Sequence, residues 1–157
     1  MKNTLSTPTM IRVVQQGDFD AWLPRWKEYQ AFYKISLDDE TTKTTWSRFF
    51  DTNEPMFAAV AILNGEVVGL VHYLFHRSTW AQQDFCYLED LFVDPQVRGR
   101  HIGKQLIEFV QGEAGRRSCA RLYWHTQEAN ATAQKLYNWV AEKPGVIEYR
   151  MPLNTPA

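Results

Sequence analysis

The stretch YLEDLFVDPQVRGRHIGK, residues 87–104, decides the fold of this chain. Its first part is largely apolar and alternating, which predicts a strand, and the Asp-Pro pair that follows predicts a turn. Gly99 and Gly103 then bracket Arg100 and His101 in a loop. Because apolar residues recur at helical spacing after this loop, the sequence predicts that the loop opens a helix.

The predicted helix, residues 102–116, offers a site for an anion at its start. The first N–H groups of a helix have no acceptor within it, and the helix dipole adds partial positive charge at that end. A diphosphate is therefore favoured there, and Arg98 and Arg100 add charge beside it. The pattern alone fits a plain strand-to-helix turn equally well. It also lacks the Gly-Lys-Ser/Thr ending of a Walker loop and the Gly-x-Gly-x-x-Gly dinucleotide fingerprint.

The second half of the chain supplies the context for this loop. ARLYWHTQ, residues 120–127, has the pattern of a strand, and Asn130 is a typical cap for a helix that ends near Val140. Tyr137 follows Asn130 by seven residues, which is two helical turns. The sequence therefore predicts that Asn130 and Tyr137 share one face of the helix.

With these motifs in this order, residues 57–153 resemble the GNAT superfamily of acetyl-CoA-dependent N-acetyltransferases. The acetyl-CoA signature of that family, Q/R-x-x-G-x-G/A, corresponds to RGRHIG at residues 98–103. His101 stands where the family has its middle glycine. Histidine tolerates unusual backbone angles better than most residues, so the resemblance implies an altered cofactor contact at this position.

The resemblance implies acetyl-CoA as co-substrate and no metal. The backbone of Leu91, Phe92 and Val93 would run beside the pantetheine arm, and one of their N–H groups would polarise the thioester carbonyl. The loop and the helix start would bind the diphosphate. The implied cofactor-binding residues are Leu91, Phe92, Val93, Arg98, Gly99, Arg100, His101, Ile102, Gly103, Lys104, Asn130 and Tyr137.

Two segments, LEDLFV and YWHTQEANATAQKLY, are similar to spermidine/diamine N-acetyltransferases and to the yeast histone/polyamine group, which includes a D-amino-acid acetyltransferase. This resemblance implies a primary amine as acceptor. It implies Glu89, nine residues before Arg98, as general base and Tyr137 as general acid. A tyrosine on such a helix is otherwise typical of a core position, and a strand glutamate of a solvated face.

The acceptor site is placed by analogy with the fold, at Tyr33, Trp80, Glu89 and Asp90. Aromatic faces and carboxylates attract a cationic amine. Alternation along the strand predicts that Glu89 shares a face with Leu91, whereas Asp90 points to the other face. Each aromatic residue alone fits ordinary packing, and the acidic residues fit a solvated surface.

Composition indicates one catalytic domain over residues 1–157, with 45% apolar and 14% aromatic residues. A net charge of −1 argues against a dedicated nucleic-acid surface. No signal-peptide pattern or run of membrane-spanning length is present, so we expect a cytoplasmic protein that does not enter a membrane. His72 and His76 have metal-like spacing, but on a strand they lie roughly 13 Å apart, too far to share a metal.

The order of elements predicts an α/β fold with a central mixed sheet and about four helices, the GNAT acyl-CoA N-acyltransferase plan. Asp18 is a plausible helix cap, and Asn64-Gly65 is a strong hairpin signal. The expected strands are 11–15, 57–63, 67–76, 87–93, 120–127 and 146–151, and the expected helices are 18–34, 38–50, 102–116 and 130–140.

The C-terminus is short for this plan, because only about sixteen residues follow Ala141 where family members commonly place two strands. A strand supplied by a second copy would complete the sheet, so we expect a homodimer through this edge. Two other classes stay open. One is an acyl-CoA-binding sensor or interaction module without turnover, which His101 keeps open. The other is a nucleotide-binding enzyme, against which the missing phosphate and ribose signals argue.

Overall fold

The computed structural model describes residues 7–97 and 99–154. Their contacts divide the chain into two compact units, with the boundary in the sequence between His125 and Thr126. Each unit is described by itself. The strands are β1 (Met10–Val13), β2 (Met56–Leu63), β3 (Glu66–His76), β4 (Phe85–Val93) and β5 (Arg121–Tyr123). The α-helices are α1 (Phe19–Phe32), α2 (Asp39–Arg48), α3 (Ile102–Arg116) and α4 (Ala131–Val140), and single 3-10 turns cover Gln16–Asp18 and Pro95–Val97.

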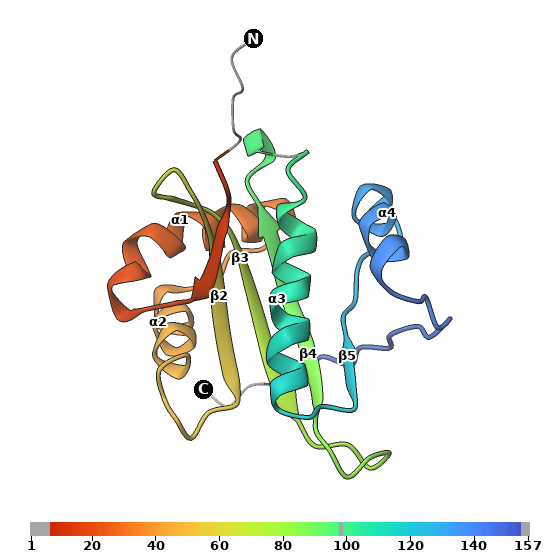
Figure 1. Cartoon of the computed structure of the whole chain (residues 1–157). Helices are drawn as coiled ribbons and strands as arrows, with labels where there is room; N and C mark the ends of the chain where they lie inside the picture. The colour runs from red at the N-terminus through yellow and green to blue at the C-terminus, as the bar shows by residue number, and fades with distance from the viewer. Residues whose placement is uncertain (1–6, 98, 155–157) are drawn as a thin grey trace. The chain divides into compact units, whose positions relative to one another are not determined.

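The five strands form one mixed sheet in the order β1-β2-β3-β4-β5 (Figure 1). The first four strands are antiparallel to their neighbours, and β5 runs parallel to β4. The turn between β2 and β3 has positive φ at both Asn64 (52°) and Gly65 (79°), as a tight hairpin turn requires. The predicted mixed sheet and its hairpin are therefore confirmed.

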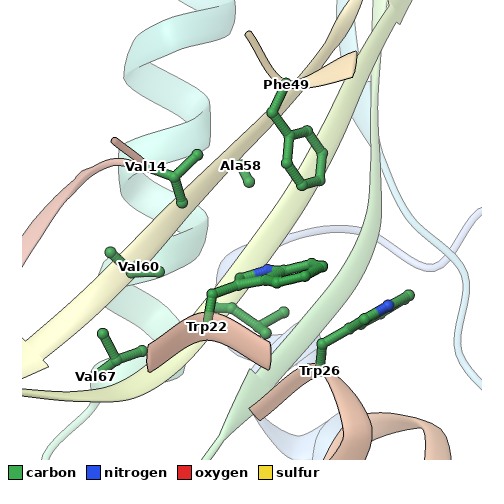
Figure 2. Packing of buried hydrophobic residues seen from close by; sticks show 8 residues of the cluster. Val14, Trp22, Trp26, Phe49, Ala58, Val60 and Val67 are labelled. Carbon is green, nitrogen blue, oxygen red and sulfur yellow. The ribbon is translucent and has the colours of Figure 1, made fainter. Parts of the chain in front are cut away.

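Helices cover both faces of the sheet, with α3 in front of it and α1 behind it in Figure 1. On the α1 face, Trp22 and Trp26 pack with Val60 of β2 in a buried apolar cluster, and Figure 2 shows their indoles lying nearly parallel. On the α3 face, Gly69 lies close to Leu106, so that an added Cβ would come within 3.4 Å of Leu106 Cδ1. Both faces of the central strands are thus buried.

The C-terminal part of the chain has less strand than predicted. The strand expected at 120–127 spans only Arg121–Tyr123, and the strand expected at 146–151 is absent from the described structure. Residues 142–154 have no regular secondary structure and are exposed. The physical reason is that a strand needs a partner for its N–H and C=O groups, and none of the described strands pairs with this segment.

Asp18 stands at the predicted N-cap position of α1, but its side chain makes no capping hydrogen bond to the helix. Its carboxylate accepts hydrogen bonds from the Gln15 N–H at 2.7 Å and from the Arg12 guanidinium at 2.6 and 3.0 Å. The hydrogen bond from Arg12 is the main cause that lowers the pKa of Asp18. The guanidinium on β1 and the preceding 3-10 turn thus use the carboxylate that the sequence assigned to the helix.

A bulge interrupts the middle of β4. Tyr73 pairs with Leu88, whereas His72, the adjacent residue on β3, pairs with Asp90. One step along β3, from Tyr73 to His72, therefore corresponds to two steps along β4, from Leu88 to Asp90. Glu89 is the extra residue. A bulge of this kind breaks the alternation of side chains and redirects the residue that it adds.

The bulge bears on the faces predicted for β4. The carboxylate of Asp90 contacts His72, whose imidazole accepts from the indole of Trp22 in α1, so Asp90 lies on the α1 face. Phe92 packs against the buried cluster on the same face, and its neighbours in the strand turn to the other face. That the side chain of Glu89 points to the face opposite Asp90 stays a prediction.

Candidate active site

Glu89 projects from the bulge in β4 and is exposed. Its pKa is raised, first because the surrounding atoms desolvate the carboxylate and second because Asp90 places a negative charge beside it. A carboxylate whose pKa is moved toward neutrality is suited to accept a proton from a reacting group.

Asp90 is engaged with the protein itself. Its side chain is 12% exposed, and its Oδ2 lies 2.9 Å from Nδ1 of His72. The charge of Asp90 also acts on the phenol of Tyr29, whose pKa is raised first by burial and then by that charge. Asp90, which the sequence placed among the acceptor residues, is therefore largely occupied by α1 and β3.

The other two acceptor candidates lie in different places. Tyr33 follows α1, and its ring centroid is 4.8 Å from that of Tyr29, the residue beside the two carboxylates. Trp80 lies in the connection between β3 and β4, is 82% exposed, and has the Arg121 guanidinium 5.7 Å from its ring centroid. The structure thus places Tyr33 next to Tyr29, whereas Trp80 lies in the connection before β4.

Much of β4 has a strand partner on one side only. β5 pairs with β4 at Phe85, Cys86 and Tyr87, and no pairing among the described strands continues along residues 88–93 on that side. Leu91, Phe92 and Val93 lie in this stretch. Backbone groups of such an edge can hydrogen-bond an extended ligand, as in strand addition.

The loop before α3 is built from left-handed residues. Gly99 has a φ of 88°, and His101, the N-cap of α3, has φ 58° and ψ 29°. The side chain of His101 makes no capping hydrogen bond, and the first N–H groups of a helix have no acceptor within the helix itself. Ile102 is 2% exposed and anchors the start of the helix. Arg98 lies outside the described residues.

The remaining residues of this loop are partly committed to the protein. The Arg100 carbonyl accepts a hydrogen bond from Nε2 of Gln105 at 3.2 Å, which ties the loop to the first turns of α3. Lys104 forms an ion pair with Glu108, with 3.1 Å between Nζ and Oε1. Gly103 lies in the first turn of α3. The loop therefore offers an anion mainly backbone donors at a positive helix end.

Asn130 and Tyr137 belong to the second unit. Oδ1 of Asn130 accepts a hydrogen bond from the Ala133 N–H at 3.2 Å, which confirms the predicted cap of α4. Nε2 of Gln134 donates to the carbonyl of Glu128 at 2.8 Å and fixes the approach to the helix. Tyr137 lies two turns after the cap and is half-buried.

Sequence reasoning missed the side chains that surround the two carboxylates. His72 was considered only as a metal ligand, whereas it lies 3% exposed between Trp22 and Asp90. A single histidine within the apolar run LVHYLF, residues 70–75, was the available signal, because a buried polar group needs partners.

The described residues contain neither a metal-binding cluster nor a membrane-spanning helix. Within residues 7–97 and 99–154, no group of three or more His, Cys, Asp or Glu residues is arranged to hold a metal ion. In the same part of the chain, no helix has the length and apolar character needed to cross a membrane.

Comparison with known proteins identifies the family. Residues 19–139 match the family model described as Acetyltransferase (GNAT) family. The D-amino-acid N-acetyltransferase HPA3 of Saccharomyces cerevisiae is 34% identical over 143 residues, which cover 90% of this chain and 89% of the yeast protein. The thialysine N-epsilon-acetyltransferase of Mus musculus is 34% identical over 156 residues, which cover 90% of this chain and 91% of the mouse protein.

Solved acetyltransferase structures share the fold. A ribosomal-protein-alanine N-acetyltransferase from Brucella melitensis has a TM-score of 0.79 at 18% identity and covers 93% of this chain and 100% of its own. The aminoglycoside N-acetyltransferase AAC(6')-Iy in complex with CoA has a TM-score of 0.80 at 20% identity, with 96% and 99% covered. The expected fold and family are confirmed, and the chain belongs to the GNAT family of acetyltransferases, which transfer the acetyl group of acetyl-CoA to an amine.

Proposed function

We propose that this enzyme acetylates the primary amine of a polyamine, an amino acid or a lysine-like side chain by direct attack on acetyl-CoA. Glu89 carries the proposal, because the bulge places an exposed carboxylate of raised pKa on the strand whose edge is open. The yeast and mouse relatives, named for D-amino-acid and thialysine acetylation, support an amine carried by a molecule of amino-acid size.

The residues present fit acetyl-CoA. The uncapped first turn of α3 and the left-handed residues Gly99 and His101 present backbone donors suited to a diphosphate. We assign the diphosphate to residues 98–104 and the pantetheine arm to the backbone of Leu91, Phe92 and Val93. Asn130 and Tyr137 complete the proposed cofactor set. When bound, acetyl-CoA supplies the acetyl thioester.

Glu89 acts as the general base. A protonated amine has no free electron pair, so a base must remove a proton, directly or through one water, as the amine nitrogen attacks the thioester carbonyl. Glu89 takes that proton, the new C–N bond forms, and the C–S bond then breaks. The neighbouring charge of Asp90 makes the carboxylate a stronger base than an ordinary glutamate.

Tyr137 acts as the general acid, because its phenol can give a proton to the departing sulfur of CoA. No covalent enzyme intermediate is required in this scheme. Cys86 is buried, and burial raises the pKa of its thiol to about 12, which disfavours the thiolate that a covalent route through this residue would need.

The amine is held by charge and by aromatic contact in this proposal. Tyr33 and the carboxylate of Glu89 bind the acceptor near the reacting nitrogen, and Asp90 contributes its negative charge from behind. Trp80 lies in the connection before β4 and would contact only a longer acceptor.

We also propose a cytoplasmic homodimer that covers the C-terminal segment. Apolar side chains in residues 146–153 are largely exposed, including Ile147 at 77% and Met151 at 83%. Pairing with a second copy would bury these side chains and satisfy the backbone of the segment. Light scattering that shows a monomer at micromolar concentration would contradict this assembly.

Release of free CoA from acetyl-CoA tests the proposed function. A thiol reagent would follow the reaction with spermidine, diamines, L- and D-amino acids and a lysine-rich peptide as acceptors. Amine-dependent release is expected with at least one of these classes and would identify the acceptor. Tight binding of acetyl-CoA without release for any amine would instead indicate the acyl-CoA sensor.

A further inference from the structure

A histidine in the middle of β3 links α1 to the bulge in β4. His72 is 3% exposed, and both of its ring nitrogens have partners. Nε2 lies 3.0 Å from the indole Nε1 of Trp22, and Nδ1 lies 2.9 Å from Oδ2 of Asp90. The rings of Trp26 and Phe49 pack against the imidazole, with centroids at 4.7 and 5.1 Å.

The hydrogen bonds fix the proton on this imidazole. An indole N–H can only donate, so Nε2 of His72 is the acceptor and carries no proton. The proton of the neutral ring therefore resides on Nδ1, which donates to the carboxylate of Asp90. Trp22, His72 and Asp90 thus form a chain of two hydrogen bonds with a single direction, from the core to β4.

The end of this chain coincides with the bulge. In the β3–β4 ladder, His72 is the first residue paired beyond the extra position, and its partner is Asp90. Glu89, the residue before Asp90, is the one that the ladder passes over. A bulge leaves its extra residue without a ladder partner, so its direction depends on the residues that hold the strand on either side.

We propose that Trp22, His72 and Asp90 form a positioning relay that holds the β4 bulge in register and thereby directs Glu89 toward the acceptor amine. This inference rests on the proposed function of Glu89 as base. Asp90 is a positioning residue in this arrangement, since its carboxylate bonds His72, and it is not a ligand of the acceptor.

The charges around Glu89 make the relay measurable. The titratable groups around its carboxylate are Asp90 in β4, His72 in β3 and the phenol of Tyr29 in α1, and of these Asp90 carries the negative charge that raises its pKa. Asp90→Asn keeps an oxygen that accepts from Nδ1 of His72 but removes the negative charge. Asp90→Ala removes both the charge and the acceptor, so the two variants separate electrostatics from position.

The experiment measures kcat and both KM values for the full-length enzyme across pH. Asp90→Ala should lower kcat about 10- to 100-fold, the size expected when a reacting group is misplaced by roughly 1 Å, with the KM for acetyl-CoA unchanged. Asp90→Asn should recover most of this loss, and its acidic limb should move to lower pH because the charge that raises the pKa of Glu89 is gone. Equal losses with an unmoved limb, an unchanged kcat in both variants, or an effect confined to the KM for the amine would overturn the relay.

Asp18→Asn is the matched control, because Asp18 is similarly covered (14% against 12% side-chain exposure) and is paired with Arg12 away from Glu89. It should leave the pH profile unchanged. Glu89→Gln, run in parallel, separates the two proposals. A variant that keeps the wild-type acidic limb would reject Glu89 as the base, whereas a lost limb beside normal Asp90 variants would reject the relay alone.

Nitrogen NMR of the histidine rings tests the relay without activity. The His72 signals, assigned by their loss in His72→Gln, should show a ring whose proton is on Nδ1 and whose Nε2 carries none. A ring protonated at Nε2 would overturn the direction of the hydrogen-bond chain. This measurement also decides the matter if Asp90→Ala does not fold.

Discussion

The bulge in β4 and the loop before α3 are both departures from regular structure, but they are held in different ways. At the bulge, side chains hold one another in place by hydrogen bonds, since His72 bonds both Asp90 and Trp22 within the core. At the loop, the shape comes mainly from the backbone, through positive φ at Gly99 and His101, with one hydrogen bond from the Gln105 side chain to the Arg100 carbonyl. The bulge is therefore held by side chains of the core, whereas the loop presents backbone donors at a positive helix end.

Glu89→Gln should abolish the catalytic role proposed for the bulge in β4 and leave acetyl-CoA binding at the loop unchanged. We expect kcat to fall about 10²- to 10⁴-fold, because an amide cannot take the proton of the amine. The acidic limb of the pH–rate profile should disappear with it, and the Kd for acetyl-CoA should stay near the wild-type value. An identical profile in the variant would point to solvent or another base.

Tyr137→Phe should affect neither region and still slow the reaction. We expect kcat to fall at least about tenfold through loss of the general acid, with the acidic limb of Glu89 and the Kd for acetyl-CoA preserved. Single-turnover kinetics would place the loss in the chemical step. Unchanged turnover would remove Tyr137 from the mechanism.

Gly99→Ala should weaken acetyl-CoA binding at the loop before α3. The φ of 88° is strained for a residue with a Cβ, although nothing lies within 4 Å of the position that this Cβ would take. The cost is therefore one of backbone conformation, roughly 1–2 kcal/mol, which corresponds to about a tenfold weaker binding of acetyl-CoA. Calorimetry would measure it, and a pH profile that moved with the Kd would show that the two regions are coupled.

The two regions also differ in how far the sequence predicts them. The start of α3 at Ile102 and the cap of α4 at Asn130 were predicted, because their signals lie within a few neighbouring residues. The bulge was not, because register is set by the partner strand: Trp22 and His72 are 50 residues apart, and His72 and Asp90 are 18 apart. The roles of Glu89 and Tyr137 stay predictions, since they rest on the family resemblance.

The strand predicted at 146–151 failed for the same reason. Its alternating residues match a strand pattern, but β2 has β1 and β3 beside it, whereas this segment has no partner among the described strands. Alternation reports which side chains could share a face. It does not report whether another strand is available.

His101→Gly should have a smaller effect, and in the opposite direction, on acetyl-CoA binding at the same loop. The change relieves a left-handed φ of 58° and removes the side chain where the family signature has glycine. We expect acetyl-CoA to bind about two- to threefold more tightly, which corresponds to less than roughly 1 kcal/mol. Weaker binding in calorimetry would show instead that the imidazole contributes to the site.

Glu89→Gln should also stabilise the protein slightly, and the dependence on pH identifies the cause. The folded pKa of Glu89 is raised, so between the unfolded and folded pKa values the native state binds more protons and stability falls as pH rises. The variant lacks this loss. Its advantage in Tm should therefore be smallest near pH 4 and grow to about 1–2 °C toward neutral pH.

The contribution of Asp18 to stability depends on pH in the opposite sense. Its lowered pKa gives stability that is present above the unfolded pKa and lost as pH falls through the folded value. The deficit of Asp18→Asn should consequently shrink in acid. Calorimetric melts of both variants from pH 4 to pH 7 would separate a charge held at a cost in the bulge from a structural ion pair, and a constant difference for Glu89→Gln would show that backbone geometry, rather than its charge, sets the cost.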